Sequence, residues 1–349
     1  MIEPYASFPG DHCGSVAMRG LLHHYCGLSL PEEAVFGLGA GAAAVYLSGP
    51  AMDPAAVLFG RTVSMEQDLA TNLQVDYREQ TESDDDRAWE IVRDEVLAGR
   101  PTMLSGDIFY LDYREFKVHF PSHRFVLLGF DDEAEQVFIA DRIRPVAETC
   151  SKNALRLSRN PPEGLSTQNL WGRFHGTEIG RDLREATRRG ISQCAKGMLT
   201  GSKPPVTEEP SLGLDEGTAG ARNGIAAIEA FADDLPSFEA RDDAAWIAGF
   251  NASCIEKFGN GGGNFRRLYS RFLNWARELD PALIPAETPE LAWRAADHWT
   301  ATSAALFRAS EGSSTSGSSE SPWLEAAREA RKAAGIELEL FSRLADATD

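Results

Sequence analysis

The hydrophobic periodicity of the chain changes near residue 145, and this change limits the folds that the sequence can adopt. Before it, short apolar segments typical of strands alternate with amphipathic helical patterns. Beyond a loop-rich stretch, the apolar positions recur almost entirely at helical spacing. A chain of 349 residues is also longer than one hydrophobic core usually serves. We therefore predict an α+β domain over 1–150 and a mostly α-helical domain over 151–349.

The predicted elements follow from periodicity and from helix and turn signals. In the first domain, helices are predicted over 14–26, followed by Gly27 as a stop signal, and over 86–98. Strands are predicted over 102–107, 124–130 and 136–141, the last two joined by a turn-like segment. In the second domain, helices are predicted over 222–235, 241–257, 264–280, 289–309 and 322–345. A flexible Ser/Gly-rich loop is expected over 310–321.

Charge and cysteine content exclude several classes of protein. The 34 Lys+Arg against 53 Asp+Glu give a formal net charge of −19, which repels nucleic acid and anionic membrane surfaces and attracts a cationic substrate. The sequence has neither a secretory signal pattern nor an apolar run of membrane-spanning length. Its five cysteines are scattered, without the spacing of a disulfide framework or a zinc site. We expect a cytoplasmic protein without metal, nucleic-acid partner or membrane association.

The segment FPGDHCGSVAMRGLL, residues 8–22, places Cys13 where the first helix is predicted to begin. A helix N-terminus carries partial positive charge and unpaired N–H groups, which stabilise a thiolate. Cys13 is therefore a candidate nucleophile, and a buried structural thiol is the alternative. The other four cysteines have no comparable setting, and we interpret them as structural.

Two further residues supply the groups that an activated thiol needs. His123 precedes an apolar strand, and Asp141 ends the next strand 18 residues later. If these strands form an antiparallel hairpin, the start of the first lies beside the end of the second. His123 would then act as a general base, with Asp141 orienting its imidazole. His119, four residues before His123, is the rival candidate for the base.

The order of cysteine, histidine and aspartate is similar to that of papain-like cysteine enzymes, especially the bacterial leader-peptidase branch. Five separated motifs extend the likeness over nearly the whole chain: HCGSVAMRGLLHHY, FGLGAGAAAVY, GDIFYLDY, HFPSHRFVLLGFD and FGNGGGNFRRLYSRFL. Together they resemble the butirosin biosynthesis protein H family. This resemblance implies a papain-like N-terminal domain followed by a helical domain.

The resemblance also implies an acyltransferase of antibiotic or other natural-product biosynthesis. An acyl group would pass from the phosphopantetheine thioester of an acyl carrier protein, or from coenzyme A, to Cys13 and then to a small-molecule amine acceptor. Cys13, His123 and Asp141 match the nucleophile, base and orienting positions, and no cofactor is implied beyond the donor thioester. Papain-like proteases have a Gln before the cysteine as an oxyanion-hole donor, and residues 2–12 contain none. The Cys13 N–H and another side chain, with His12 the nearest candidate, would have to form the hole.

Asp107 and Tyr110 are candidates for binding the acceptor. They follow the first predicted strand and should lie at the same end of the sheet as His123. They would hold the amine of the acceptor. The alternative is that Asp107 only caps the following turn.

A glycine-rich segment, GNGGGNFRRLY, is a candidate for binding the donor. Backbone N–H groups at Gly261 and Gly262, with Arg266 beside them, would bind a phosphopantetheine phosphate or a carboxylate. The alternative is an interhelix turn in which Asn264 is the N-cap. A basic stretch over 181–189, which includes Arg184 and Arg188, is a candidate for docking an acidic carrier protein.

Other functions remain open for the same residues. A cysteine hydrolase acting on peptides, amides or thioesters would use the same three side chains, and so would a cyclase in which the acyl chain supplies its own nucleophile. A non-catalytic carrier-binding scaffold would have kept the fold without the chemistry. Amine dependence of thioester turnover separates transfer from hydrolysis, and the alkylation rate of Cys13 separates an enzyme from a scaffold.

Overall fold

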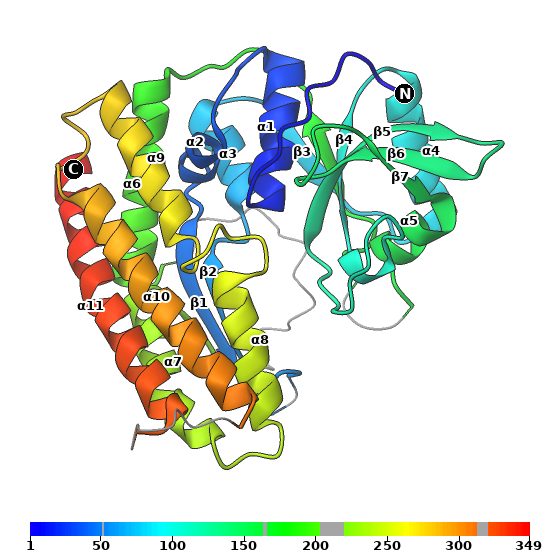
Figure 1. Cartoon of the computed structure of the whole chain (residues 1–349). Helices are drawn as coiled ribbons and strands as arrows, with labels where there is room; N and C mark the ends of the chain where they lie inside the picture. Colours follow the sequence, from blue (N-terminus) through cyan, green and yellow to red (C-terminus); the bar gives the residue numbers. More distant parts are fainter. Residues whose placement is uncertain (51, 163–165, 203–219, 313–319) are drawn as a thin grey trace. The chain divides into compact units, whose positions relative to one another are not determined.

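The computed structural model of the chain describes residues 1–50, 52–162, 166–202, 220–312 and 320–349 (Figure 1). The chain divides into two compact units. The first contains Met1–Val35 and Leu73–Gly180, and the second contains Phe36–Asn72 and the described residues after 180. The predicted Ser/Gly-rich loop falls mainly on residues 313–319, outside the described residues.

The first unit is built on a six-stranded sheet in the order β3-β8-β4-β5-β6-β7, in which every pair of neighbours is antiparallel. Its strands are β3 (Tyr77–Gln80), β4 (Thr102–Gly106), β5 (His123–Asp131), β6 (Gln136–Ala140), β7 (Glu148–Ser151) and β8 (Trp171–Phe174). Its helices are α1 (Cys13–Cys26), α4 (Asp85–Leu97), the 3-10 helix η1 (Ile108–Tyr110) and α5 (Lys152–Arg159).

Alternate residues of the central strands point to opposite faces of this sheet. Phe125 and Leu127 of β5 pack with Val92 of α4 and with Ala154 and Leu155 of α5. Helix α1 contacts β4, β5 and β8, and it buries an apolar stripe that includes the wholly inaccessible Met18, Leu21 and Leu22. Because helices cover both faces, β4 and β5 are apolar along most of their length.

The predicted elements of the first unit are confirmed within a few residues. Gly27 adopts a left-handed conformation and ends α1, as its position in the sequence predicts. The predicted hairpin is also present, because β5 pairs with β6 from Asp131 opposite Gln136 to Val126 opposite Ala140. Three strands, β3, β7 and β8, were not predicted, since four residues are too few to show a period.

The second unit contains most of the helices and a small sheet. Its strands, in the order β2-β1-β9, are β1 (Ala42–Ser48), β2 (Ala56–Arg61) and β9 (Gly220–Asn223). Its helices are α3 (Met65–Leu73), α6 (Leu183–Thr200), α7 (Ile225–Phe238), α8 (Ala244–Glu256), α9 (Arg266–Leu279), α10 (Thr288–Ser310) and α11 (Pro322–Thr348). The boundary between the units falls within α2 (Glu32–Leu38). The five predicted C-terminal helices are confirmed. In the described residues, no helix has the length and apolarity needed to span a bilayer.

The compact units do not follow the predicted division at residue 150. Residues 42–61 form strands of the second unit, because β1 pairs with β9 and packs against α6 and α7. Residues 152–174 supply α5 and β8 to the first unit, because β8 pairs with β3 and β4. Both differences from the predicted division depend on strand pairing between distant segments, which local periodicity does not reveal.

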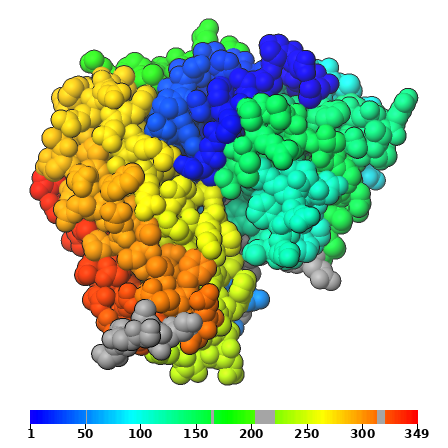
Figure 2. Space-filling model, in the orientation of Figure 1, coloured from blue at the N-terminus to red at the C-terminus, as the bar shows by residue number. Residues whose placement is uncertain are grey.

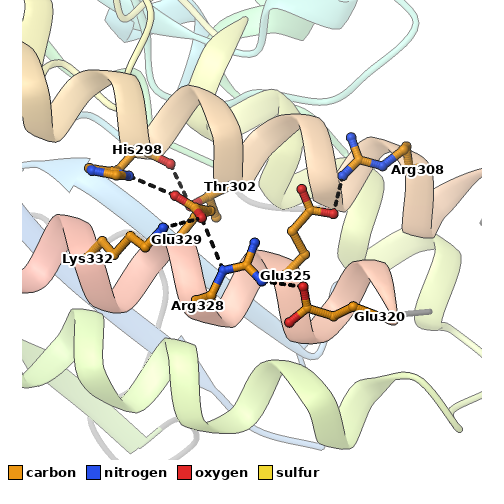
Figure 3. Close-up of polar contacts among 8 residues, drawn as sticks. All are labelled: His298, Thr302, Arg308, Glu320, Glu325, Arg328, Glu329 and Lys332. Atoms are coloured by element: carbon orange, nitrogen blue, oxygen red, sulfur yellow. Dashed lines mark hydrogen bonds and ion pairs between the residues drawn. The ribbon is translucent and has the colours of Figure 1, made fainter. Parts of the chain in front are cut away.

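The last two helices of the second unit, α10 and α11, are joined by an ionic network (Figure 3). Glu329 of α11 accepts hydrogen bonds from His298 Nδ1 of α10 at 2.7 Å and from Lys332 Nζ at 2.9 Å, and Arg328 lies beside it. Arg308 and Glu325 form a further pair between the two helices. The outer surfaces of α9, α10 and α11 lie side by side on the face seen in Figure 2, coloured yellow to red.

Arg266 lies at the centre of the second unit and is 0% exposed. Its guanidinium forms a two-pronged ion pair with Glu337, at 2.8 and 2.7 Å, and donates to the carbonyl oxygens of Gly60 and Ala43. Trp299 Nε1 also donates to Glu337, at 2.6 Å. These contacts correct the prediction that Arg266 binds the donor, because its donors are committed to the interior and solvent does not reach it.

Removing one charge of this pair should destabilise the second unit strongly. We expect Arg266→Met to lower the free energy of unfolding by about 3–5 kcal/mol, because Glu337 keeps a buried, uncompensated charge. Adding Glu337→Gln should recover most of the loss, since both charges are then gone while an acceptor for Trp299 remains. Urea unfolding measures each value. Arg267→Met, at a half-exposed neighbour, is the matched control, and an equal loss there would contradict the assignment.

Candidate functional site

Cys13 is the first residue of α1, at the position where the dipole of a helix is positive. Its side chain is 7% exposed, and the first turn of the helix contains no acidic residue. His12 is the N-cap, and its Nδ1 accepts a hydrogen bond from the Ser15 N–H at 3.2 Å. The positive potential at the N-terminus of the helix therefore acts on the thiol, and no carboxylate in the first turn weakens it.

The loop before Cys13 is held at two points within the first unit. The Glu32 carboxylate accepts hydrogen bonds from the N–H groups of Asp11 and His12, the latter at 2.6 Å. The Gly10 N–H donates to the carbonyl oxygen of Arg142, at 2.8 Å. A Cβ at Gly10 would lie 2.4 Å from a Glu32 oxygen, so only glycine fits this approach. The start of α1, with Cys13, is thereby tied to the strand end that carries Asp141.

The β5–β6 hairpin brings His123 and Asp141 together. His123 is the first residue of β5, Asp141 follows the last residue of β6, and His123 Nε2 lies 2.9 Å from Asp141 Oδ2. His123 also forms a hydrogen bond with the Cys13 side chain. Because Nε2 faces Asp141, the ring offers Nδ1 to the thiol. Cys13, His123 and Asp141 form one buried cluster at the N-terminus of α1.

Asp141 has further partners outside the three predicted catalytic residues. The Tyr113 hydroxyl donates to its Oδ2 at 2.8 Å, and the Arg142 N–H donates to its Oδ1 at 2.6 Å. The largely buried Arg114 forms an ion pair with it at 3.0 Å. Tyr113 ends the motif GDIFYLDY, so the unusual run of aromatic and acidic residues was the available signal. These contacts fix the carboxylate and compensate its burial.

Opposing effects set the protonation states of this cluster. Burial lowers the pKa of His123, but the charge and hydrogen bond of Asp141 and the contact with Cys13 outweigh it and raise this pKa to about 9. For Asp141, burial raises the pKa, whereas His123, Arg114 and Tyr113 hold it well below its usual range. At neutral pH the pair is an imidazolium and a carboxylate. A cation beside the Cys13 sulfur favours its thiolate form.

The other four cysteines are free thiols in settings that oppose ionisation. Burial raises the pKa of Cys194 to about 12, even though contacts with Ala42, Tyr269 and Arg266 lower it. Burial also raises the pKa values of Cys26, Cys150 and Cys254. These thiols stay protonated at neutral pH, in agreement with their interpretation as structural.

The structure places the two predicted acceptor-binding residues at the end of β4. Asp107 is buried and caps η1, and its Oδ1 accepts from the N–H groups of Phe109 and Phe120 at 3.0 and 2.9 Å. Its Oδ2 lies 2.7 Å from Nδ1 of His119. The carboxylate is thus occupied within its own loop, which fits the capping alternative. Tyr110 is half-buried, with its ring 5.7 Å from that of His119.

The predicted donor site at Gly261 and Gly262 is corrected by the contacts of this loop. Both glycines have left-handed φ angles, 71° and 81°, as expected for a tight turn. The Gly262 N–H donates to Asn260 Oδ1, and the Gly263 N–H donates to Glu256. A carboxylate at this position disfavours a phosphate. The interhelix-turn alternative therefore describes the loop, except that Phe265 rather than Asn264 is the N-cap of α9.

The basic stretch over 181–189 has local acidic partners. Arg188 Nε lies 2.9 Å from Glu185, and Arg184 lies 3.9 Å from Asp280. Their charge is partly compensated within the second unit. The positive potential at these two residues, on which the predicted docking of a carrier protein depends, is therefore reduced.

We expect His123→Asn to slow the alkylation of Cys13 by iodoacetamide at neutral pH about tenfold, because the thiolate loses its adjacent cation. The difference should vanish near pH 9.5, where the thiol ionises without help. Mass spectrometry of the peptide containing Cys13 measures the rate, and Cys13→Ser reports the contribution of the other thiols. Equal rates at neutral pH would show that His123 does not activate Cys13.

The raised pKa of His123 also predicts how stability depends on pH. The pKa of His123 is about 9 in the folded protein, above the ordinary unfolded value of about 6.5. The stability that the protonated imidazole contributes is therefore fully present below pH 6.5 and is lost as pH rises through 9. Urea unfolding should compare Cys13→Ala with Cys13→Ala/His123→Asn, so that the thiol does not titrate. Between pH 6 and 10, we expect the free energy of unfolding of Cys13→Ala to fall by on the order of 2 kcal/mol more than that of the double variant. Parallel profiles would contradict the paired imidazolium.

Comparisons with known families agree with the resemblance found in the sequence. Residues 12–142 match the family described as butirosin biosynthesis protein H, N-terminal, and this range includes Cys13, His123 and Asp141. Residues 153–344 match a domain of unknown function, DUF4872. A comparison with curated proteins found no match. The chain belongs to the family in which the butirosin biosynthesis protein H N-terminal domain precedes DUF4872.

Proposed function

We propose that this protein is a cysteine acyltransferase that forms amides in natural-product biosynthesis. The observation that carries the proposal is the contact of Cys13 at a helix N-terminus with His123, which is in turn held by the buried Asp141. The membership in a biosynthetic family supports an enzyme, and the antiparallel sheet with Cys13 on the adjoining helix supports a papain-like arrangement. The donor would be an acyl thioester of phosphopantetheine, carried by an acyl carrier protein or by coenzyme A.

In the first step, the Cys13 thiolate attacks the carbonyl carbon of the donor thioester. The bond between that carbon and the pantetheine sulfur breaks, and the protonated His123 gives its proton to the departing thiolate. Asp141 keeps the imidazole oriented during this transfer. The products are an acyl group on Cys13, a free pantetheine thiol and a neutral His123.

The tetrahedral intermediate needs donors for its oxyanion. The Cys13 N–H at the start of α1 is one candidate. His12 is the second, because its Nδ1 accepts from the Ser15 N–H and its neutral ring therefore carries the proton on Nε2. Glu32 holds the backbone of His12 and so fixes this loop. These groups would take the place of the glutamine used by papain-like proteases.

In the second step, an amine attacks the acyl group on Cys13. His123 accepts a proton from the amine, the carbon–sulfur bond breaks and the thiolate–imidazolium pair is restored. The formal net charge of −19 favours an acceptor that carries several positive charges. Water in place of the amine would make the same cluster a hydrolase.

Intact-protein mass spectrometry tests the proposal. We expect incubation with a panel of acyl pantetheine thioesters to add the acyl mass to the native chain and not to Cys13→Ala. Adding polyamines or aminoglycosides should discharge the acyl-enzyme faster than water and yield the corresponding amide. Discharge at the same rate without an amine would indicate a hydrolase. A free thiol that no donor acylates, with an ordinary alkylation rate, would indicate a non-catalytic scaffold.

A further inference from the structure

The first unit contains a second pair of a histidine and an aspartate, outside the cluster of Cys13. His119 Nδ1 lies 2.7 Å from Asp107 Oδ2. The carboxylate is buried, whereas the imidazole side chain is 56% exposed. This pair differs from His123–Asp141, in which both side chains are buried.

The two pairs lie at the same end of neighbouring strands. In the antiparallel pairing of β4 with β5, Gly106 is opposite His123. Asp107 is therefore one residue beyond the strand position that faces His123. The loop that carries His119 closes between the two strands, where the Ile108 N–H donates to the Phe120 carbonyl at 3.2 Å.

Neighbouring groups hold the second pair in place. The N–H groups of Phe109 and Phe120 hold Asp107 Oδ1, and Ser158 binds the Asp107 backbone through two hydrogen bonds. The Phe109 ring stacks on the imidazole, with 4.1 Å between centroids. Because the buried carboxylate faces Nδ1, a neutral His119 carries its proton there, and its basic lone pair is on Nε2 at the far side of the ring.

The proposed reaction produces one more proton than His123 can take. An amine acceptor exists at neutral pH mainly as an ammonium ion, which loses two protons on becoming an amide N–H. His123 is neutral in the acyl-enzyme and accepts one of them, which restores the imidazolium. Because His123 is buried beside Asp141, it cannot pass a second proton to solvent while it holds the first. A second base with access to solvent would accept the other proton from the bound ammonium ion.

We infer that His119, oriented by Asp107, is this second base, which deprotonates the ammonium form of the acceptor before attack. The inference rests on the proposed acyl transfer. His119 Nε2 takes a proton from the ammonium nitrogen and releases it to water, and the resulting amine attacks the Cys13 thioester. Asp107 acts as a positioning residue, and the ring centroid of Tyr110 lies 5.7 Å from that of the imidazole.

The test follows discharge of acetylated Cys13 in the full-length chain. The activated ester p-nitrophenyl acetate supplies the acetyl group, so that recognition of the natural donor is not needed. Ethylamine and hydroxylamine then compete as acceptors, with loss of the acetyl mass followed by intact-protein mass spectrometry. Ethylamine is protonated at neutral pH and needs a base, whereas hydroxylamine is already largely neutral.

We expect His119→Gln to lower the ratio of ethylamine discharge to hydroxylamine discharge at neutral pH about 10- to 100-fold. The ratio should approach the native value near pH 10.5, close to the pKa of an alkylammonium ion, where a large share of the ethylamine is already neutral. His175→Gln, at an exposed histidine of the same unit, is the matched control and should leave the ratio unchanged.

Two results would overturn the inference. One is an unchanged ratio in His119→Gln, and the other is an equal loss with both acceptors, which would indicate a role in positioning alone. Failure of the proposed function has a different signature in the native chain: Cys13 would take up no acetyl group, or its acetyl group would be lost to water as fast without an amine as with one. In that case both the transfer and the role of His119 are rejected.

Discussion

The contact between His123 and Asp141 is the interaction on which the candidate site depends. It places a negative charge in the interior, and that charge is supported by Arg114, by the Tyr113 hydroxyl and by the Arg142 N–H. In return the carboxylate keeps the imidazole protonated at neutral pH, since it raises the pKa of His123 to about 9 against the effect of burial. A protonated imidazole is what a cysteine thiolate requires beside it.

Backbone contacts connect this arrangement to Cys13. Gly10 binds the residue after Asp141, and Glu32 binds the backbone of Asp11 and His12 just before α1 begins. The start of the helix and the end of the hairpin are therefore fixed to each other. The proposed acyl transfer uses both parts of this assembly, and the Asp107–His119 pair adds a solvent-exposed base at the same end of the sheet.

In the second unit, the motif that was predicted to bind the donor has a structural role. Arg266 and its glycine-rich loop have the composition of an anion site, yet Glu337, Asn260 and Glu256 already use their donors. Sequence composition identifies which groups are present but does not show which of them are already paired. The same limit applies to Asp107, whose carboxylate is engaged by its own loop.

The sequence by itself determined the helices and strands with clear periodicity, the start of α1 at Cys13, and the hairpin that joins His123 to Asp141. These features depend on local signals: apolar spacing, a stop signal at Gly27, and a tight turn that joins β5 to β6. The register shift between Leu127 and Gly129 within this hairpin is not among them. Only the tertiary structure decided the division into units, the partners Tyr113 and Arg114, and the burial of Arg266. Those features arise from contacts between residues far apart in the chain, which local periodicity does not reveal.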